Sequence, residues 1–226
     1  MNNAKIPEIT DSTELIPVNP AIESYMRNLV VHTDHPVLAE MEEFARLQNF
    51  PIVNRLVGIF LETQARMINA KRIFEFGSGY GYSAYWFAQA VGEEGRVICS
   101  DADAKNCVRA EHYLTALNLW QQIDFCVGRA QEVFAQTDGL FDICYNDVDK
   151  AGYPEVWRMA RNRIRSGGLY IADNVLWHGR VALKTTDPIE ESTAAIMEHN
   201  QLIFDDPEFD AFINPIRDGV IVARKK

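Results

Sequence analysis

From Lys71 onward, the sequence alternates short β-prone runs with amphipathic segments of helical period. Strands that alternate with helices of about 10–15 residues are typical of β-α-β units, which build parallel sheets. The end of the chain differs, because Arg217-Asp218-Gly219 separates two apolar runs at residues 209–216 and 220–223. An Asp-Gly pair in that position predicts a hairpin. We therefore predict an α/β fold with a mostly parallel seven-stranded sheet that ends in an antiparallel hairpin; its other strands are expected at residues 72–76, 96–100, 123–127, 141–145 and 169–172.

The first 70 residues have a helical period instead, in amphipathic segments at residues 21–31, 37–47 and 54–68. We find no internal repeat and no linker, so the 226 residues are expected to form one domain, with a helical N-terminal extension (1–70) and an α/β core (71–226). Helices of the core are expected at residues 82–91, 104–117, 130–135 and 154–164 and near 190–201.

Charge and composition narrow the classes of function. The chain has 22 Lys and Arg against 32 Asp and Glu, a net charge of −10, and an acidic surface repels nucleic acids and anionic lipids. No run approaches the roughly 20 apolar residues that cross a bilayer, and the polar N-terminus, broken by prolines, does not resemble a secretory signal. Three of the four cysteines lie in strand-like runs without C-x-x-C spacing. Buried, reduced thiols and a cytoplasmic location are therefore expected.

A glycine-rich turn follows the first expected strand. Glycines let the backbone approach a ligand, and the next helix offers free N–H groups at its N-terminus. Gly77 and Gly79 fit a dinucleotide fingerprint, but Tyr82 stands in the third glycine position, and no Gly-Lys-Ser/Thr follows. Glu75, just before the turn, would repel a pyrophosphate and suits a cationic group such as an amine.

Asp101 ends the second expected strand, twenty residues after Gly81, where a carboxylate can accept both hydroxyls of a ribose. Together with Glu75, Gly77 and Ser83, it describes a pocket for a nucleoside that carries an amino acid. S-adenosylmethionine fits this description. A glycine turn without a ligand is the alternative.

Two further expected strands end in oxygen-bearing side chains. Asp147 follows the fourth strand, and Asp173 and Asn174 follow the fifth. In a parallel sheet these ends lie at the same edge as the glycine turn, where ligands bind in open α/β sheets. Oxygen-only donors favour Mg²⁺, Mn²⁺ or Ca²⁺ over zinc. Solvated loops are the alternative.

Lys150 lies close to these donors in the sequence. A lysine beside a divalent cation, in a site closed to water, gives up its proton more readily, because both effects disfavour the charged form. Lys150 could then accept a proton from a phenolic hydroxyl, whose oxygen would attack a sulfonium methyl group. The alternative is a surface lysine at the start of a helix.

Four segments resemble signatures of the metal-dependent class I O-methyltransferases, the group that contains the caffeoyl-CoA and catechol O-methyltransferases. They are residues 75–83 (EFGSGYGYS), 147–153 (DVDKAGY), 167–179 (GGLYIADNVLWHG) and 218–223 (DGVIVA). The resemblance covers about residues 35–226 and is greatest to bacterial members of the group.

The resemblance implies a Rossmann-like methyltransferase fold, a homodimer, and roles for single residues. It implies a general base, Lys150, and three metal ligands, Asp147, Asp173 and Asn174. Trp177 and Tyr153 fall where the family lines its substrate pocket, although both could equally be packing residues. The implied contacts to S-adenosylmethionine are Glu75, Gly77, Ser78, Ser83, Asp101, Ala130 and Asp147.

Two positions depart from the family pattern. Asn146 stands where the family usually has an apolar strand residue, so it needs a buried hydrogen-bond partner or a local bulge. Tyr80 stands where a small or β-branched residue is common. The first 34 residues match no part of the family, and in relatives this region helps to cover the active site.

The function expected from these residues is cation-dependent methyl transfer from S-adenosylmethionine to a hydroxyl of a small catechol-like acceptor. One alternative keeps the chemistry but methylates hydroxyuridine in tRNA, as one bacterial branch of the family does. The tRNA contact would then be a helix that carries Arg158, Arg161, Arg163 and Arg165, for which a solvated helix is the simpler interpretation. The other alternative is a cofactor-binding protein without catalysis.

Overall fold

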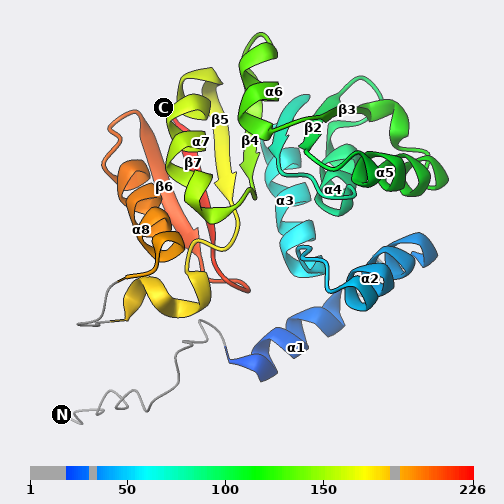
Figure 1. Cartoon of the computed structure of the whole chain (residues 1–226), viewed down its shortest axis with the longest axis horizontal. Coiled ribbons are helices and arrows are strands. Elements are labelled where there is room, and N and C mark those ends of the chain that lie inside the picture. The colour runs from blue at the N-terminus through cyan, green and yellow to red at the C-terminus, as the bar shows by residue number, and fades with distance from the viewer. Residues whose placement is uncertain (1–18, 31–34, 184–188) are drawn as a thin grey trace.

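The computed structural model describes residues 19–30, 35–183 and 189–226. Its centre is a seven-stranded sheet with the strand order β3-β2-β1-β4-β5-β7-β6 (Figure 1). The first five strands pair in parallel, and β7 pairs antiparallel with both β5 and β6, which confirms the predicted sheet and hairpin. The strands are β1 (Arg72–Phe76), β2 (Arg96–Asp101), β3 (Ile123–Val127), β4 (Phe141–Asn146), β5 (Ile164–Ala172), β6 (Phe209–Asn214) and β7 (Val220–Lys225).

Helices cover both faces of the sheet, each over its own apolar core. Along β1, Ile73 belongs to the core under α2 to α5 and Phe74 to the core under α6 to α8, as the alternation of side chains along a strand requires. The helices are α1 (Pro20–Leu29), α2 (Pro36–Gln48), α3 (Arg55–Met67), α4 (Tyr82–Val91), α5 (Ala104–Ala116), α6 (Ala130–Gln136), α7 (Tyr153–Ala160) and α8 (Glu191–Phe204).

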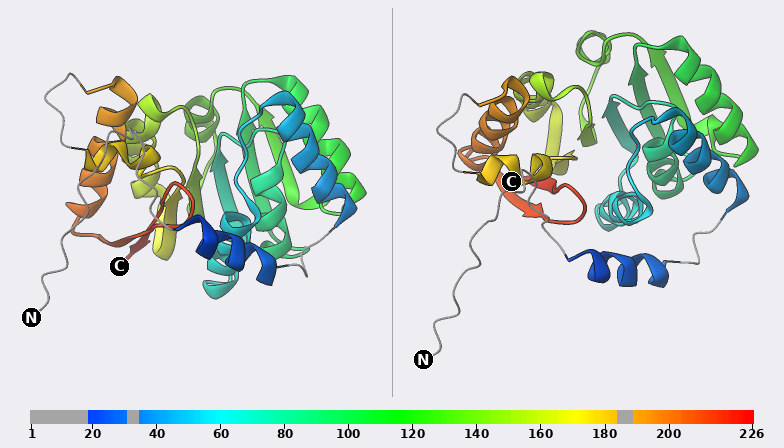
Figure 2. Two further views of the ribbon diagram at one scale, coloured as in Figure 1. Left: turned by 90° about the horizontal axis from the view of Figure 1, so that it is seen from below. Right: turned by 60° about the horizontal axis from the view of Figure 1, so that its bottom comes forward.

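The helix α1 lies outside these two layers, as both views of Figure 2 show, and none of its side chains is buried. Its link to the rest is polar, since the Asn54 side-chain amide donates to Glu23 over 3.2 Å. The Asn54 carbonyl oxygen also accepts from the Val57 amide over 3.0 Å, which caps α3. The last residue predicted for this first helix, Val31, lies outside the described residues.

The helix predicted over residues 154–164 is wrong at its C-terminal end. α7 ends at Ala160, the segment Arg161–Arg163 is a 3-10 turn, and β5 begins at Ile164, which pairs with Phe141 of β4. The pairing with β4 overrides the helical period here, because a strand with a partner gains ladder hydrogen bonds that no local sequence pattern reveals.

The four arginines predicted to share one helix therefore lie on three different elements. Arg158 lies on α7, Arg161 and Arg163 on the 3-10 turn, and Arg165 on β5. The predicted basic helix face is therefore not formed. In addition, each of the four guanidinium groups binds a partner within the chain. Arg158 pairs with Glu198, Arg161 with Asp206 and Glu208, and Arg165 with Asp142, while Arg163 donates to the carbonyls of Phe134 and Gly139.

Asn146, at the end of β4, has the buried hydrogen-bond partner that its position requires. Its side-chain amide lies 2.9 Å from the Tyr170 hydroxyl, which lies 2.9 Å from the Nε2 atom of His199 on α8. Burial lowers the pKa of His199 to about 4, so this imidazole is neutral around pH 7. A neutral polar chain thus joins β4, β5 and α8 behind the edge of the sheet.

Tyr80 connects the glycine turn to the N-terminal helices. Its hydroxyl donates to the Met41 carbonyl of α2 over 2.9 Å, and its ring packs edge-on against Phe44 and Phe50. The bulky side chain at this position therefore fixes α2 and the segment after it over the turn.

All four cysteines are free thiols; Cys99 and Cys144 are buried and Cys107 and Cys126 half-buried, so the expected burial holds fully for two of them. Within the described parts of the chain, none of the helices combines the length and apolar character that a membrane span requires. The single-domain organisation and the cytoplasmic location stay predictions.

Candidate active site

The carboxyl ends of β1, β2, β4 and β5 and the turn between β6 and β7 surround one cavity of about 1310 Å³. Ser78 and Ser83 line a smaller adjoining pocket of about 30 Å³. Glu75, Tyr153 and Asp173 are fully buried and belong to neither wall. The residues of the predicted site that line the large cavity are Gly77, Asp101, Ala130, Asp147, Lys150, Asn174 and Trp177.

The turn after β1 is built for close approach of the backbone. Gly77 has φ +83°, and a Cβ atom there would lie 2.7 Å from the Asp147 carbonyl oxygen, so only glycine fits beside the end of β4. The Ser78 amide donates to the Ser100 carbonyl over 2.9 Å, which ties the turn to β2. Gly81 precedes α4 without a side-chain cap, which leaves N–H groups of the first helical turn for a ligand.

Glu75 lies beneath this turn. Its carboxylate accepts from the Ser83 hydroxyl of α4 and from the Cys99 thiol at 3.5 Å. Burial raises the pKa of Glu75 to about 7, against the opposing effect of its hydrogen bonds with Ser83 and Ser78. The structure therefore shows Glu75 holding the turn to α4, while its predicted contact with the cofactor stays a prediction.

Asp101 lies at the end of β2 with its carboxylate oriented by neighbours. One oxygen accepts from the Gly79 amide over 3.1 Å. The other accepts from the Asp103 amide over 2.8 Å and the Asn106 side chain over 3.0 Å. Each oxygen has two lone pairs, so the oxygen that accepts from Gly79 has one left, with which this carboxylate on the cavity wall can still accept a hydroxyl group.

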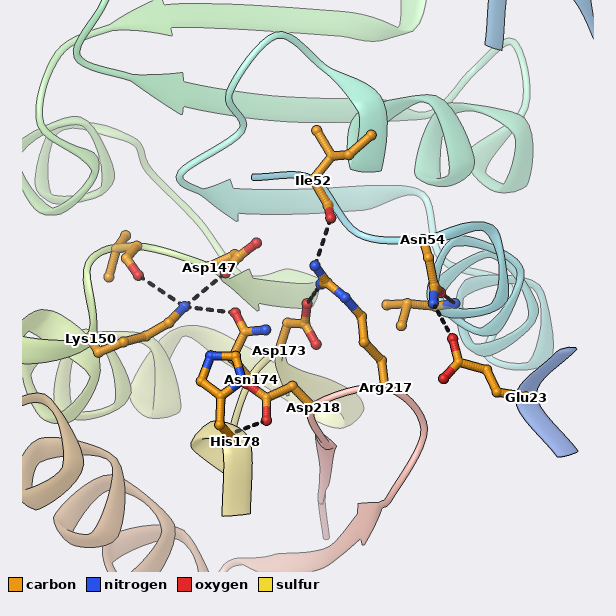
Figure 3. A network of polar contacts seen from close by, with 12 residues as sticks. Glu23, Ile52, Asn54, Asp147, Lys150, Asp173, Asn174, His178, Arg217 and Asp218 are labelled. Atoms are coloured by element: carbon orange, nitrogen blue, oxygen red, sulfur yellow. Dashed lines mark hydrogen bonds and ion pairs between the residues drawn. The ribbon is translucent and has the colours of Figure 1, made fainter. Parts of the chain in front are cut away.

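The predicted metal ligands come together around Lys150, which follows β4 (Figure 3). Its Nζ atom lies 3.0 Å from Oδ1 of Asp147 and 2.8 Å from Oδ1 of Asn174. The Tyr153 hydroxyl accepts from the same Nζ over 2.7 Å and donates to the Asp173 carbonyl over 2.8 Å. Tyr153 thus orients Lys150 from behind and does not reach the cavity wall, which favours its packing role over substrate contact.

Asp173, directly after β5, carries the most unusual carboxylate of the site. It is 0% exposed, and its Oδ1 atom has no hydrogen-bond partner among the described residues. Burial and the nearby Asp147 carboxylate raise the pKa of Asp173 to about 6. A buried carboxylate oxygen without a partner is costly, and a cation would satisfy it.

The oxygens of Asp147, Asp173 and Asn174 therefore fit a hard divalent cation. The described residues contain no cluster of three or more His, Cys, Asp or Glu side chains suited to a metal. The third protein donor would accordingly be the amide oxygen of Asn174, which has a left-handed backbone (φ +57°).

Arg217 is not among the site residues predicted from the sequence, in which it is only part of the hairpin turn. The guanidinium pairs with Oδ2 of Asp173 over 2.8 Å and donates to the Ile52 carbonyl over 2.9 Å. The available signal was its position beside Asp218-Gly219, in a hairpin predicted to close the sheet that carries the acidic strand ends.

Trp177 lies on the cavity wall in a strained segment, since both Trp177 and His178 have left-handed backbones (φ +47° and +55°). The indole Nε1 is buried without a hydrogen-bond partner in the described parts of the structure. Its predicted contact with the substrate stays a prediction.

Comparison with known proteins agrees with this site. The profile of the O-methyltransferase family matches residues 26–226, so the match begins nine residues before the predicted start at residue 35, and the prediction that the first 34 residues match no part of the family is wrong for residues 26–34. A catechol O-methyltransferase of Niastella koreensis is 31% identical over 166 residues, which cover 71% of this chain and 75% of that protein. A caffeoyl-CoA O-methyltransferase of Mesembryanthemum crystallinum is 29% identical over 178 residues, 74% of this chain and 70% of that one.

The fold is likewise similar to solved structures. The crystal structure of a methyltransferase from Geobacter sulfurreducens superimposes with a TM-score of 0.79 and 27% sequence identity, over 92% of this chain and 96% of that one. The chain therefore belongs to the O-methyltransferase family, which confirms the predicted fold class and the predicted enzyme class, S-adenosylmethionine-dependent O-methyltransferase.

Proposed function

We propose that this enzyme methylates a hydroxyl of a small catechol-like acceptor with the help of a bound divalent cation. The observation that carries the proposal is the convergence of Asp147 and Asn174 on Lys150, close enough to the buried Asp173 for electrostatic interaction, on the edge that also holds the glycine turn. The methyl donor and the acceptor hydroxyl can therefore meet in one cavity, where orientation of the two reactants lowers the barrier.

The cofactor half of the cavity suits S-adenosylmethionine, which supplies a methyl group on a cationic sulfur. Gly77 and Gly79 admit the ligand close to the backbone, and Asp101 presents a carboxylate oxygen for a ribose hydroxyl. Ala130 begins α6 on the same wall, on the side proposed for the adenine. Asp147, which is also a proposed metal ligand, lies on the same cavity wall and adds negative charge beside the sulfonium.

The acceptor half suits a vicinal diol. A bound cation would lower the pKa of a coordinated hydroxyl, and Asp147, Asp173 and Asn174 would hold that cation. Lys150 is the proposed general base, because its Nζ atom lies among these ligands with the side chain only 13% exposed. Tyr153 keeps the amine in place through its hydrogen bond, and Trp177 is the proposed aromatic wall for the acceptor.

The charge of the wall favours a small neutral acceptor over tRNA. Among its described residues, Arg129, Lys150 and Arg217 supply the Lys and Arg charges, and Lys150 and Arg217 already bind carboxylates. The carboxylates on the wall outnumber them: Glu23, Asp101, Asp103, Asp147, Asp149 and Asp218. The arginines proposed for tRNA all have partners within the chain, as described above.

The test is methyl transfer to a panel of diphenols with and without EDTA. We expect turnover of at least one vicinal diol, its loss in chelator, and its return with Mg²⁺ or Mn²⁺, while S-adenosylhomocysteine still binds by calorimetry in chelator. Full activity in EDTA would contradict cation dependence. Filter binding of tRNA at low salt, where electrostatic binding is strongest, would revive the tRNA alternative if it were tight. A homodimer also stays a proposal, for light scattering to test.

A further inference from the structure

Arg217 lies in the turn between β6 and β7 and reaches the metal-ligand set from the side opposite Lys150 (Figure 3). Its Nη1 atom lies 2.8 Å from Oδ2 of Asp173, and its Nη2 atom donates to the Ile52 carbonyl over 2.9 Å. Two anchors at the two ends of one planar guanidinium fix its orientation beside Asp173. The backbone of the turn is closed by a hydrogen bond from the Gly219 amide to the Ile216 carbonyl, 2.9 Å long.

The carboxylate that Arg217 contacts has little freedom of its own. The Asp173 amide donates to the Asn146 carbonyl over 3.3 Å, and its carbonyl accepts from the Tyr153 hydroxyl over 2.8 Å, so the backbone is held from both sides. The side chain is 0% exposed. Of its two oxygens, Oδ2 is taken by Arg217, and only Oδ1 is free of partners among the described residues.

We propose that Arg217 selects the metal ion, because it limits Asp173 to one donor oxygen. The inference rests on the cation site proposed above and adds a role for a residue outside the ligand set. Mg²⁺ takes six oxygens at close to octahedral angles and usually keeps several waters, whereas Ca²⁺ takes six to eight and often binds both oxygens of a carboxylate. With Asp173 limited to one oxygen, the donor set of Asp147, Asp173 and Asn174 suits Mg²⁺ or Mn²⁺ better than Ca²⁺, which loses one possible protein ligand.

A simpler role would be a purely structural link between the hairpin turn and the segment after α2. The ratio of two metal affinities separates these roles. If Arg217 only ordered the turn or supplied one positive charge, its loss would change the affinities for Ca²⁺ and Mg²⁺ in the same direction, because both ions carry the same charge. The ratio of the two affinities would then change little. Only a change in the number of available oxygens favours the ion with the higher coordination number.

The experiment measures metal binding to the cofactor-free protein without turnover. Bound Mn²⁺ is followed by the loss of the free-ion EPR signal, and Ca²⁺ and Mg²⁺ are titrated as competitors. We expect Arg217→Gln to raise the Ca²⁺-to-Mg²⁺ affinity ratio by about tenfold, the lower end of the effects seen for residues that orient metal ligands. Arg217→Lys, which keeps a cation beside Oδ2, should stay within about threefold of wild type. Arg158→Gln, which removes a surface charge paired with Glu198, should leave the ratio unchanged.

An unchanged ratio in a folded Arg217→Gln protein that still binds Mn²⁺ would overturn the proposal. If that variant fails to fold, a crystal of the wild-type protein soaked with Ca²⁺ decides: coordination through Oδ1 alone supports the proposal, and coordination through both oxygens with Arg217 displaced overturns it. Wild-type protein that binds no Mn²⁺ would remove the proposed cation site itself, which is a different result from an unchanged ratio.

Discussion

The two halves of the cavity satisfy their charges in different ways. In the cofactor half, Glu75 and Asp101 accept hydrogen bonds from the turn and the helices beside it, so the cradle is complete within the chain. In the acceptor half, where the cation is proposed to bind, Lys150 and Arg217 form ion pairs with Asp147 and Asp173, and one oxygen of Asp173 has no partner in the described structure. The cofactor half is thus preformed, whereas the charges of the oxygen donors Asp147 and Asp173 are fully compensated only when a ligand binds.

The largest expected effect is that of Lys150→Met, which tests whether the acceptor half can be changed without affecting the cofactor half. We expect kcat to fall about 10²–10⁴-fold, the usual range for loss of a general base, while the affinity for S-adenosylhomocysteine stays within about threefold because the cofactor half is untouched. Mn²⁺ binding should persist, since the change frees Oδ1 of Asp147 and Asn174. The exposed Lys105→Met on α5 is the matched control. An unchanged kcat across the pH range would reject Lys150 as the base.

The second test addresses the contact between Gly77 of the cofactor half and Asp147 of the acceptor half. Gly77→Ala would place a Cβ atom 2.7 Å from the Asp147 carbonyl, in addition to the strain of a left-handed backbone. We expect a loss of about 2–3 kcal/mol in unfolding free energy, measured by urea denaturation, together with weaker binding of both S-adenosylhomocysteine and Mn²⁺.

Gly167→Ala is the control for that strain. It has a similar φ of +74°, but its Cβ atom would meet only the ends of Arg165 and Arg224 at 3.3 and 3.4 Å. It should cost about 1 kcal/mol and leave both ligands unaffected. Equal effects of Gly77→Ala and Gly167→Ala on stability and on ligand binding would show that Gly77 does not link the cofactor half to the acceptor half.

The smallest effect concerns the cofactor half alone. Because the pKa of Glu75 is raised to about 7 in the folded chain, the folded state binds the proton more tightly than the unfolded state. The stabilising contribution is therefore present at low pH and is lost as the pH rises through about 7. Glu75→Gln keeps the polar contacts without the titration, so its Tm relative to wild type should rise by about 5–10 °C between pH 5 and pH 8. A pH-independent Tm difference, measured without ligands by calorimetry, would contradict this account of Glu75.

Most elements of the fold could be predicted because they are locally encoded. The seven strands and the hairpin follow from β-prone runs and an Asp-Gly turn, and the glycine turn from spacing alone. The failure at Ala160 has a tertiary cause, because Ile164 joins the sheet through a partner more than twenty residues away. The same error produced the predicted arginine face, since helical spacing means nothing once Arg165 lies on a strand.

Of the candidate site, the sequence could identify the donors but not their surroundings. Parallel strands bring their carboxyl ends to one edge, so Asp147, Asp173 and Asn174 were predictable as neighbours. The burial of Tyr153 behind Lys150 was not predictable, because a substrate-contacting tyrosine and a packing tyrosine have the same sequence pattern.

The sequence by itself determined which side chains end the strands and which glycines admit a ligand. Those residues also indicate the family to which the chain belongs. Only the tertiary structure decided how the two oxygens of Asp173 are used. Arg217 lies 44 residues further along the chain and meets Asp173 because β7 pairs antiparallel with β5. Local sequence sets where a side chain starts, whereas its charge partners depend on which distant backbones the sheet brings within a few ångströms.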